Sequence, residues 1–239
     1  MNAVAIIPAR LSSTRLPRKM LLEIAGEPLI VRVYAGVRSS SLLRDVLVAT
    51  DSDEIVQLCQ SKHIPVRLTS PACRNGTERV HEISREIPGD LYINVQGDEL
   101  LARSEHIMAL VNLMEDPGAQ VGTLKITAAP EDILNPNAVK IVTDKSGRAL
   151  YFSRSAIPFD RDGTRPRYFK HLGFYAYRKA ALDAYATWPE SPLEASERLE
   201  QLRFLENGVP IRVTETLCDT IRVDTPEDLH KAEVILRNR

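Results

Sequence analysis

Cysteine is scarce in this sequence. The 239 residues include only Cys59, Cys73 and Cys218. Their odd number and wide spacing exclude a disulfide framework and give no CxxC metal pattern. Free thiols are typical of a reducing compartment, so we expect a cytoplasmic protein.

Long hydrophobic runs are also missing. No stretch approaches the roughly 20 apolar residues that a membrane-spanning helix needs. The apolar N-terminal segment meets Pro8 and Arg10 too soon to form the core of a signal peptide. We therefore expect no association with a membrane.

An excess of one charge is absent as well. The chain has 31 basic and 32 acidic residues, and its net charge of -1 gives no bulk attraction for nucleic acid. The HExxH, GxSxG, Walker A and GxGxxG patterns are all missing, which argues against zinc hydrolysis and acyl transfer. We therefore expect no nucleic acid as a partner and no zinc-dependent hydrolysis.

The hydrophobic pattern of the first half predicts alternating strands and helices. Short β-branched runs at 4–7 and 91–95 are typical of strands buried on both faces of a parallel sheet. Further strands are expected at 45–50 and 66–68, with helices at 28–37, 53–62 and 77–87 and another from Ser104. This order predicts right-handed βαβ units in one α/β domain spanning residues 1–239.

The pattern changes after Pro117. Strands at 121–126, 139–143 and 149–154, separated by turns, predict an antiparallel excursion within a mixed sheet. The remaining expected elements are strands at 211–215 and 221–223 and helices at 179–185, 193–206 and 226–236. We find no linker, repeat or low-complexity segment.

A basic loop follows the first strand. Arg10, Arg15, Arg18 and Lys19 lie within ten residues, with no acid between them. Ligands of open α/β sheets bind beyond the carboxyl ends of the strands. Backbone N–H groups, hydroxyls and cations there suit a polyphosphate. The alternative is a solvated basic loop.

Two acidic segments follow later strands. Asp98, after Gly97, is a candidate Mg²⁺ ligand, and an acidic turn is the equal alternative. Gly97 would let the backbone approach a ligand closely. Glu227 and Asp228 fit the first turn of a helix, so Asp224 is the better candidate ligand of its segment.

Other polar motifs allow a structural and a functional interpretation. Gly76 and Thr77 start a helix, and free main-chain groups there also suit a base edge or a ribose. A lone histidine such as His171 is more often structural than a ligand. Glu200 and Gln201 fit one polar face of a helix.

In their order along the chain, these segments resemble the cytidylyltransferases of Kdo, 3-deoxy-D-manno-octulosonate (CMP-Kdo synthetases). The resemblance covers nearly the whole chain and separates this family from the related sialic acid cytidylyltransferases. Its anchors are Ile7-Pro8-Ala9-Arg10-Leu11, Ser13-Thr14-Arg15-Leu16-Pro17, Gly76-Thr77-Glu78-Arg79, Asn94-Val95-Gln96-Gly97-Asp98-Glu99, Asn135-Pro136-Asn137, Tyr151-Phe152-Ser153-Arg154, His171-Leu172-Gly173, Leu199-Glu200-Gln201-Leu202-Arg203 and Val223-Asp224-Thr225-Pro226-Glu227-Asp228-Leu229.

The resemblance implies a Rossmann-like nucleotidyltransferase fold. Its central sheet would be mostly parallel, with helices on both faces and an antiparallel dimerisation subdomain at about 120–175. It implies transfer of CMP from CTP to the anomeric hydroxyl of Kdo, which gives CMP-Kdo and pyrophosphate for lipopolysaccharide biosynthesis. Mg²⁺ would be the cofactor, and the enzyme would be a cytoplasmic homodimer.

The resemblance also implies roles for individual residues. The nucleotide would be bound by Pro8, Ala9, Arg10, Ser13, Lys19, Gly76, Thr77 and Gln96. The sugar would be bound by Arg15, Gln96, Arg154, His171, Glu200 and Gln201. Asp98 and Asp224 would hold Mg²⁺, and with Lys19 and Arg10 they form the implied catalytic set.

The sequence departs from the family pattern in several places. Family members usually have glycine where this chain has Arg222 and proline where it has Leu100. They usually have histidine and serine at the positions of Cys73 and Asn75, and Gly-Lys-Pro at 18–20. Leu100 and Arg222 flank the implied metal ligands, so local geometry and sugar selectivity remain open.

Three alternatives stay open for the function. One is a cytidylyltransferase for another acidic sugar, such as 8-amino-Kdo or a sialic-type sugar. Another is a catalytically silent nucleotide-binding protein, although both aspartates and the lysine are present. A metal-dependent glycosyltransferase is disfavoured, because the segment with Asp98 lacks the DxD pair.

Overall fold

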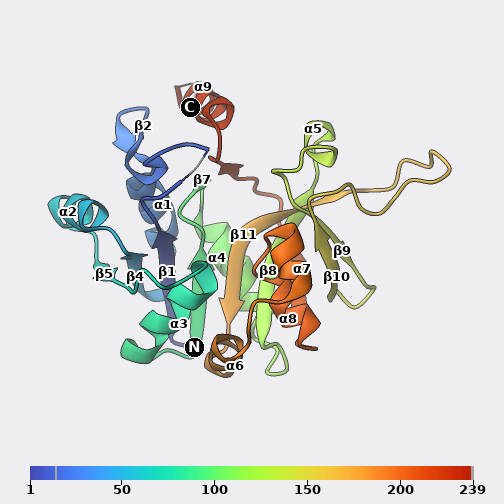
Figure 1. Cartoon of the computed structure of the whole chain (residues 1–239), viewed down its shortest axis with the longest axis horizontal. Coiled ribbons are helices and arrows are strands. Elements are labelled where there is room, and N and C mark those ends of the chain that lie inside the picture. The colour runs from blue at the N-terminus through green and yellow to red at the C-terminus, as the bar shows by residue number, and fades with distance from the viewer. Residues whose placement is uncertain (14, 238–239) are drawn as a thin grey trace.

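A nine-stranded mixed sheet forms the centre of the molecule (Figure 1). The computed structural model describes residues 1–13 and 15–237, so Thr14 of the basic loop lies outside the described residues. The strands of this sheet are β1 Ala3–Ala9, β4 Leu43–Thr50, β5 Val66–Leu68, β6 Leu91–Val95, β8 Val121–Thr127, β9 Lys140–Thr143, β10 Ala149–Ser153, β11 Phe169–Tyr177 and β12 Ile211–Glu215. Two small two-stranded sheets pair β2 Glu23–Ile24 with β3 Glu27–Pro28 and β7 Glu99–Leu100 with β13 Ile221–Arg222.

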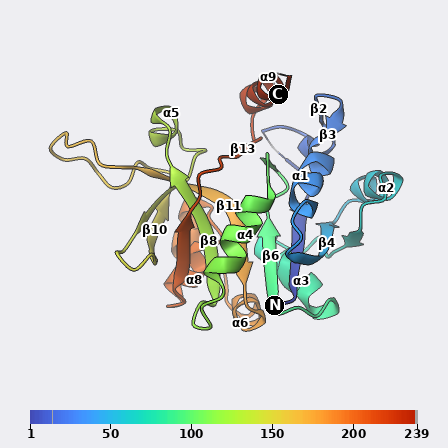
Figure 2. The ribbon, with the colours of Figure 1, turned by 180° about the vertical axis from the view of Figure 1, so that it is seen from behind.

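The helices cover both faces of the sheet, as predicted. They are η1 Lys19–Leu21, α1 Leu29–Arg38, α2 Asp53–Ser61, α3 Gly76–Glu86, α4 Ser104–Leu113, α5 Pro130–Ile133, α6 Lys179–Thr187, α7 Pro192–Glu197, α8 Leu202–Glu206 and α9 Pro226–Arg237. In Figure 1, α3, α6, α7 and α8 lie in front of the sheet, and the reverse view of Figure 2 brings α1 and α4 forward.

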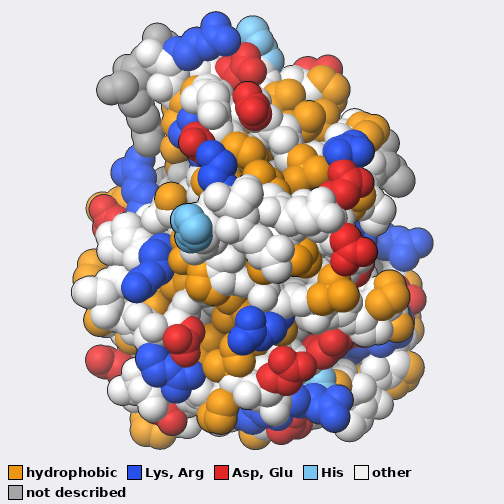
Figure 3. All heavy atoms as spheres, turned by 90° about the vertical axis from the view of Figure 1, so that its left-hand side faces the viewer, with side chains coloured by type: hydrophobic (Ala, Val, Ile, Leu, Met, Phe, Trp, Pro, Cys, Tyr) orange, Lys and Arg blue, Asp and Glu red, His pale blue; other side chains and the backbone are white. Residues whose placement is uncertain are grey.

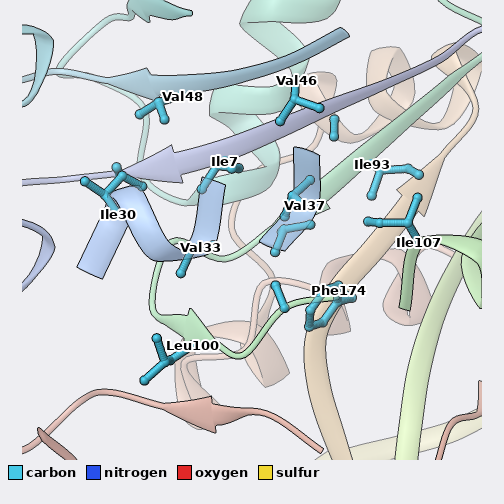
Figure 4. Packing of buried hydrophobic residues seen from close by; sticks show 14 of the residues in the cluster. Ile7, Ile30, Val33, Val37, Val46, Val48, Ile93, Leu100, Ile107 and Phe174 are labelled. Atoms are coloured by element: carbon cyan, nitrogen blue, oxygen red, sulfur yellow. The ribbon is translucent and has the colours of Figure 1, made fainter. Parts of the chain in front are cut away.

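The alternation of side chains along β1 separates two hydrophobic cores. Ala5 and Ile7 face the core that contains α1 and α4, whereas Val4 and Ile6 face the core that contains α3, α6 and α8. Figure 4 shows the first of these cores, in which side chains of α1 point toward those of the central strands. Both faces of β1 are therefore buried, which explains its continuous apolar run.

Most strands of the sheet run in one direction, which confirms the predicted class. β1 pairs in parallel with β4 and β6, and β4 pairs in parallel with β5. β11 is antiparallel to both β6 and β8, so β8 runs in the same direction as β6. β12 is parallel to β8, whereas β9 and β10 form the antiparallel extension.

The strand β11 was missed by the sequence analysis, which treated its residues as an isolated motif. Gly173 interrupts the apolar pattern in the middle of this strand. A Cβ atom at this position would lie 2.5 Å from Glu99 Oε1, so a larger residue would push the carboxyl group of Glu99 on β7 out of this contact. The reason for the glycine is a contact across 74 residues of chain, which no local pattern reveals.

The single helix predicted at 193–206 was wrong. Helix α7 ends at Glu197, the next residue Arg198 is left-handed with a φ of 55°, and α8 begins only at Leu202. The buried ion pair between Arg203 and Glu194, with N–O distances of 2.6 and 2.7 Å, holds α8 against α7. Glu200 and Gln201 therefore lie in a tight turn and not on a helix face.

Other boundaries differ by a residue or two. α1 begins after Pro28, and α3 begins at Gly76 because the side chain of Asn75 caps it by accepting from the N–H of Glu78.

Within residues 1–13 and 15–237, no helix is both long and apolar enough to cross a bilayer. On the face shown in Figure 3, basic and acidic side chains are intermingled.

The central position of β11 leads to a stability prediction. Leu172 on β11 is 2% exposed, so Leu172→Ala should lower the free energy of unfolding by about 2–5 kcal/mol, because it leaves a cavity. Urea denaturation measures this change. The matched control is Leu217→Ala at a position that is 94% exposed, where we expect a change within about 0.5 kcal/mol. Equal effects of the two changes would contradict the assigned burial of β11.

Candidate active site

A cavity of about 820 Å³ opens beyond the carboxyl ends of β1 and β6. Its walls come from the loop after β1, the turn after β6, the start of α3, the turn between α7 and α8, and the segment from β13 to α9. Most of the site residues implied by the resemblance line it, namely Pro8, Ala9, Arg10, Ser13, Arg15, Lys19, Gly76, Gln96, Asp98, Arg154, Glu200, Gln201 and Asp224. Thr77 and His171 are not among the lining residues.

The centre of the cavity floor is an ionic triad. The ammonium of Lys19 lies 2.5 Å from Asp98 Oδ2 and 2.6 Å from Asp224 Oδ1, and all three side chains are more than nine-tenths buried. Burial alone would raise the pKa of Asp98, but the charges of Lys19 and Arg222 outweigh it and hold that pKa well below its usual range. The two aspartates therefore converge, as the hypothesis of a shared site required.

Backbone pairing explains this convergence. In the small sheet, Arg222 of β13 lies opposite Glu99 of β7, and the N–H of Val223 donates to the carbonyl of Asp98 over 3.0 Å. The chain on each side of Asp98 is thus joined to the chain that leads into Asp224. Sequence analysis missed β7, because a two-residue strand carries no periodicity.

Gly97 brings the turn after β6 against the end of β1. A Cβ atom here would lie 2.8 Å from the carbonyl oxygen of Pro8. The sequence predicted that the backbone at Gly97 approaches a ligand closely. In the structure this glycine instead lies close to the backbone of Pro8. The glycine thus places Asp98 beside the basic loop.

Two arginines add to the charge around the carboxylates. Arg15 Nη2 lies 2.8 Å from Asp224 Oδ2, and its Nη1 donates to Asn137 Oδ1. Arg222 Nε lies 3.1 Å from Asp224 Oδ2 and 3.6 Å from Asp98 Oδ2. Three cationic side chains, those of Lys19, Arg15 and Arg222, therefore surround two carboxylates.

The basic loop divides into two parts. Arg10, Arg15 and Lys19 line the cavity, and Arg10 has no hydrogen bond or ion pair within the described part of the chain. Arg18 does not line the cavity and instead pairs with Glu54 of α2. Arg18 therefore matches the alternative of a solvated basic loop, whereas the guanidinium of Arg10 lies in the cavity where it can bind an anion.

The donor set fits a magnesium ion that also binds phosphate. Asp98 Oδ1 is buried and has no hydrogen-bond partner among residues 1–13 and 15–237. Mg²⁺ commonly takes one or two carboxylates and completes its shell with waters and phosphate oxygens. The same described residues contain no cluster of three or more histidine, cysteine or acidic residues that could hold a metal without a substrate. Magnesium at Asp98 and Asp224 stays a prediction.

A second polar group lies where α3 begins. Glu200 Oε1 accepts from Gln96 Nε2 and Oε2 from the N–H of Thr77, each over 2.9 Å. Burial raises the pKa of Glu200 even though the positive end of α3 favours its charge. A Cβ atom on Gly76 would lie 2.7 Å from Gln96 Nε2, so a larger residue there would displace the amide of Gln96. Thr77, which does not line the cavity, therefore holds Glu200 in place through its backbone N–H.

His171 lies beneath this surface. Its Nε2 is 2.9 Å from Thr123 Oγ1, and its ring packs against Phe152 and Tyr175. Burial lowers the pKa of His171 to about 3, so the ring is neutral at ordinary pH. These contacts match the structural interpretation, and the sugar-binding role of His171 stays a prediction that no described contact supports.

Arg154 lines the cavity, but much of its guanidinium is engaged. Its Nε donates to the carbonyl of Glu197 over 2.7 Å and its Nη1 to the carbonyl of Pro136 over 2.9 Å. It therefore joins the turn at 135–137 to the end of α7, and only part of its donor capacity faces a ligand.

Several lining residues were not predicted. The Tyr175 hydroxyl donates to Gln201 Oε1 over 3.2 Å, and the missed strand β11 carries this tyrosine. Arg79 is buried beside Asp51. It belongs to the segment Gly76-Thr77-Glu78-Arg79, so that motif could have identified it as a residue of the site. Glu194 and Arg203 owe their position to the break between α7 and α8.

Comparison with known proteins identifies the family. A sequence model described as Cytidylyltransferase matches residues 4–216. The 3-deoxy-manno-octulosonate cytidylyltransferase of Koribacter versatilis is 59% identical over 239 residues, which is 100% of this chain and 91% of that protein. The chain belongs to the 3-deoxy-manno-octulosonate cytidylyltransferase family. The namesake from Acidobacterium capsulatum is 51% identical over 100% of this chain and 98% of its own length.

Solved structures agree with this assignment to the 3-deoxy-manno-octulosonate cytidylyltransferase family. A CMP:2-keto-3-deoxy-manno-octonic acid synthetase, solved in complex with CTP, superposes with a TM-score of 0.92 at 38% identity, covering 100% of this chain and 99% of that one. HddC from Yersinia pseudotuberculosis superposes with a TM-score of 0.74 at 13% identity, covering 99% of this chain and 100% of its own. At that identity the likeness of HddC shows the shared fold alone.

The buried neutral state of His171 leads to a pH prediction. The unfolded chain takes up a proton at this histidine near pH 6.5, whereas the folded chain does so only near pH 3. Stability should therefore fall as pH drops between these values, by ~1.4 kcal/mol per pH unit from this group. His171→Gln should remove that part of the slope in denaturation series at pH 4.5–6. An unchanged slope would show that His171 is protonated in the folded protein.

Proposed function

We propose that this chain transfers a cytidylyl group from CTP to the anomeric 2-hydroxyl of Kdo, yielding CMP-Kdo and pyrophosphate. The observation that carries the proposal is the triad of Lys19, Asp98 and Asp224 on the floor of a cavity lined by the basic loop. The names of the relatives, and the CTP in the solved homologue, give the substrates.

In the proposed reaction, the 2-hydroxyl oxygen bonds to the α-phosphorus of CTP. The bond from that phosphorus to the bridging oxygen breaks, pyrophosphate leaves with the electron pair, and the hydroxyl proton passes to solvent. Reactions of this kind depend on alignment and on neutralisation of charge more than on covalent help from the protein.

The protein's own residues would supply most of that neutralisation. Arg10, whose guanidinium has no partner among the residues that the structure describes, would bind the phosphates, and Lys19 would add its ammonium from the floor of the cavity. Arg15, which donates to Asn137 and lines the cavity, suits the carboxylate of the sugar. Mg²⁺ held by Asp98 and Asp224 would supply a Lewis acid for the phosphate oxygens and lower the pKa of a bound hydroxyl.

Product identification tests the reaction most directly. Enzyme, CTP, Mg²⁺ and Kdo are mixed, and the product is identified by mass spectrometry while pyrophosphate release is followed. CMP-Kdo is the expected product. Turnover with 8-amino-Kdo or a sialic-type sugar but not with Kdo would replace the proposed acceptor. Binding of CTP with no turnover on any sugar would favour a silent nucleotide-binding protein.

Asp98→Asn tests the role of the aspartate pair. The change keeps the shape of the side chain and removes one charge, so we expect the protein to fold and kcat to fall by about 100-fold or more. Asp116→Asn, on an exposed carboxylate that pairs with Arg212, is the matched control and should leave kcat unchanged. Thermal unfolding of each variant checks the fold. Full turnover in Asp98→Asn would remove this residue from the proposed metal site.

The proposed enzyme works in the cytoplasm as a homodimer whose contact uses the antiparallel region at about 120–175. In support, the segment between β10 and β11 extends away from the body of the chain (Figure 1) and carries Phe159, which is 86% exposed. Light scattering after gel filtration should give twice the chain mass, and Phe159→Asp should shift the peak toward the monomer because it buries a charge. A monomeric wild-type protein would contradict the proposal.

A further inference from the structure

Arg222 is placed to control the charge of the aspartate pair. Its Nε is buried and approaches Asp224 Oδ2 at 3.1 Å and Asp98 Oδ2 at 3.6 Å without hydrogen-bond geometry. The side chain lines the cavity and is 36% exposed. It thus lies against the pair through a buried atom, while part of its side chain remains exposed in the cavity.

The backbone fixes this placement. Arg222 lies on β13, opposite Glu99 on β7, and the next residue, Val223, donates its N–H to the carbonyl of Asp98. Rotation of the side chain can take the guanidinium away from the carboxylates, but the Cα stays beside them. The backbone pairing of β13 therefore fixes Arg222 beside the two carboxylates.

Charge counting shows what the arginine does. Lys19, Arg15 and Arg222 carry three positive charges against two negative charges on Asp98 and Asp224. Without Arg222, the positive and negative charges of this group balance. Glu99 lies nearby, where burial raises its pKa and its carboxyl group accepts from the N–H of Gly173 and from Thr220 Oγ1. Removing Arg222 makes the site more negative by one unit in either state of Glu99.

We propose that Arg222 acts as a built-in counter-ion that keeps a divalent cation off Asp98 and Asp224 until a nucleotide brings its own negative charge. The inference rests on the proposed function of this pair as the metal site. A triphosphate would offer the guanidinium other partners and offset its charge, so that metal and nucleotide enter together. Arg222 thus acts on the metal only through its charge beside the two carboxylates.

The magnitude of the effect is measurable. Two unit charges 4 Å apart interact strongly in a partly buried site, where the effective dielectric constant is roughly 20. Removal of one positive charge beside the pair should tighten binding of a divalent cation to the free protein by about tenfold or more. The change should be smaller when CTP is present, because the phosphates already offset the arginine.

Mn²⁺ serves as the probe, because free Mn²⁺ is counted directly by electron paramagnetic resonance. The titration is made without nucleotide on the wild type, Arg222→Met, Arg222→Gln and Arg222→Lys. We expect weak binding by the wild type and by Arg222→Lys, and binding about tenfold tighter by both neutral variants. Arg18→Met, which removes an arginine paired with Glu54 outside the cavity, is the control and should match the wild type.

Two additional titrations locate the metal and separate the outcomes. Adding Asp98→Asn to Arg222→Met should abolish the gain, and a gain that survives would overturn the proposal by placing Mn²⁺ elsewhere. Equal affinity of wild type and the neutral variants without CTP would also overturn it, while leaving the metal site itself intact. Failure of the wild type to bind Mn²⁺ with CTP present would overturn the metal role in the proposed function and this inference with it. Thermal unfolding of each variant checks that it is folded. If only one of Arg222→Met and Arg222→Gln folds, the titration of that variant is enough for the test.

Discussion

The contact on which the site depends is the one between the ammonium of Lys19 and the carboxylates of Asp98 and Asp224. Asp98 and Asp224 lie 79 and 205 positions after Lys19 in the chain, and its ammonium is within hydrogen-bond distance of both carboxylates. Removing buried charges from water costs several kcal/mol per ion, and close, bonded partners must offset that cost. Loss of one partner would leave the others uncompensated, so the three segments are held in one arrangement before any substrate arrives.

The same arrangement divides the cavity into two sides. The basic loop with Arg10 lies toward the end of β1, whereas Gln96 and Glu200 meet at the start of α3. Asp98 lies two residues after Gln96, so the turn after β6 reaches both sides. The hydrogen bonds from Gln96 N–H to the carbonyl of Gly173, and from Gly173 N–H to Glu99, fasten this turn to β11. A rigid turn keeps charge and polar groups aligned, which is the requirement of transfer between two bound substrates.

The sequence was sufficient where structure is decided locally. Apolar runs such as those of β1 and β6 identified the parallel half of the sheet, and strand ends identified Asp98 and Asp224 as candidates. It failed where a distant contact decides. In the sequence Gly173 resembles a strand breaker, because its contact with Glu99 is visible only in the structure. The sequence of α7 and α8 likewise resembles one continuous helix, because the ion pair between Arg203 and Glu194 that packs them together is not apparent from it. The burial of His171 likewise depends on Phe152 and Thr123, which belong to other strands.

The resemblance to the family predicts a role for the two carboxylates, but it does not describe the electric field of the charges around them. That field is a sum over all nearby charges, and one arginine changes it as much as one aspartate does. Arg222 lies two residues before Asp224 and pairs through its backbone with the segment of Asp98, so its charge is added where the two carboxylates meet. Two chains with the same ligands can therefore differ in when a metal binds, because the order of binding depends on the charge balance and not on the ligands alone.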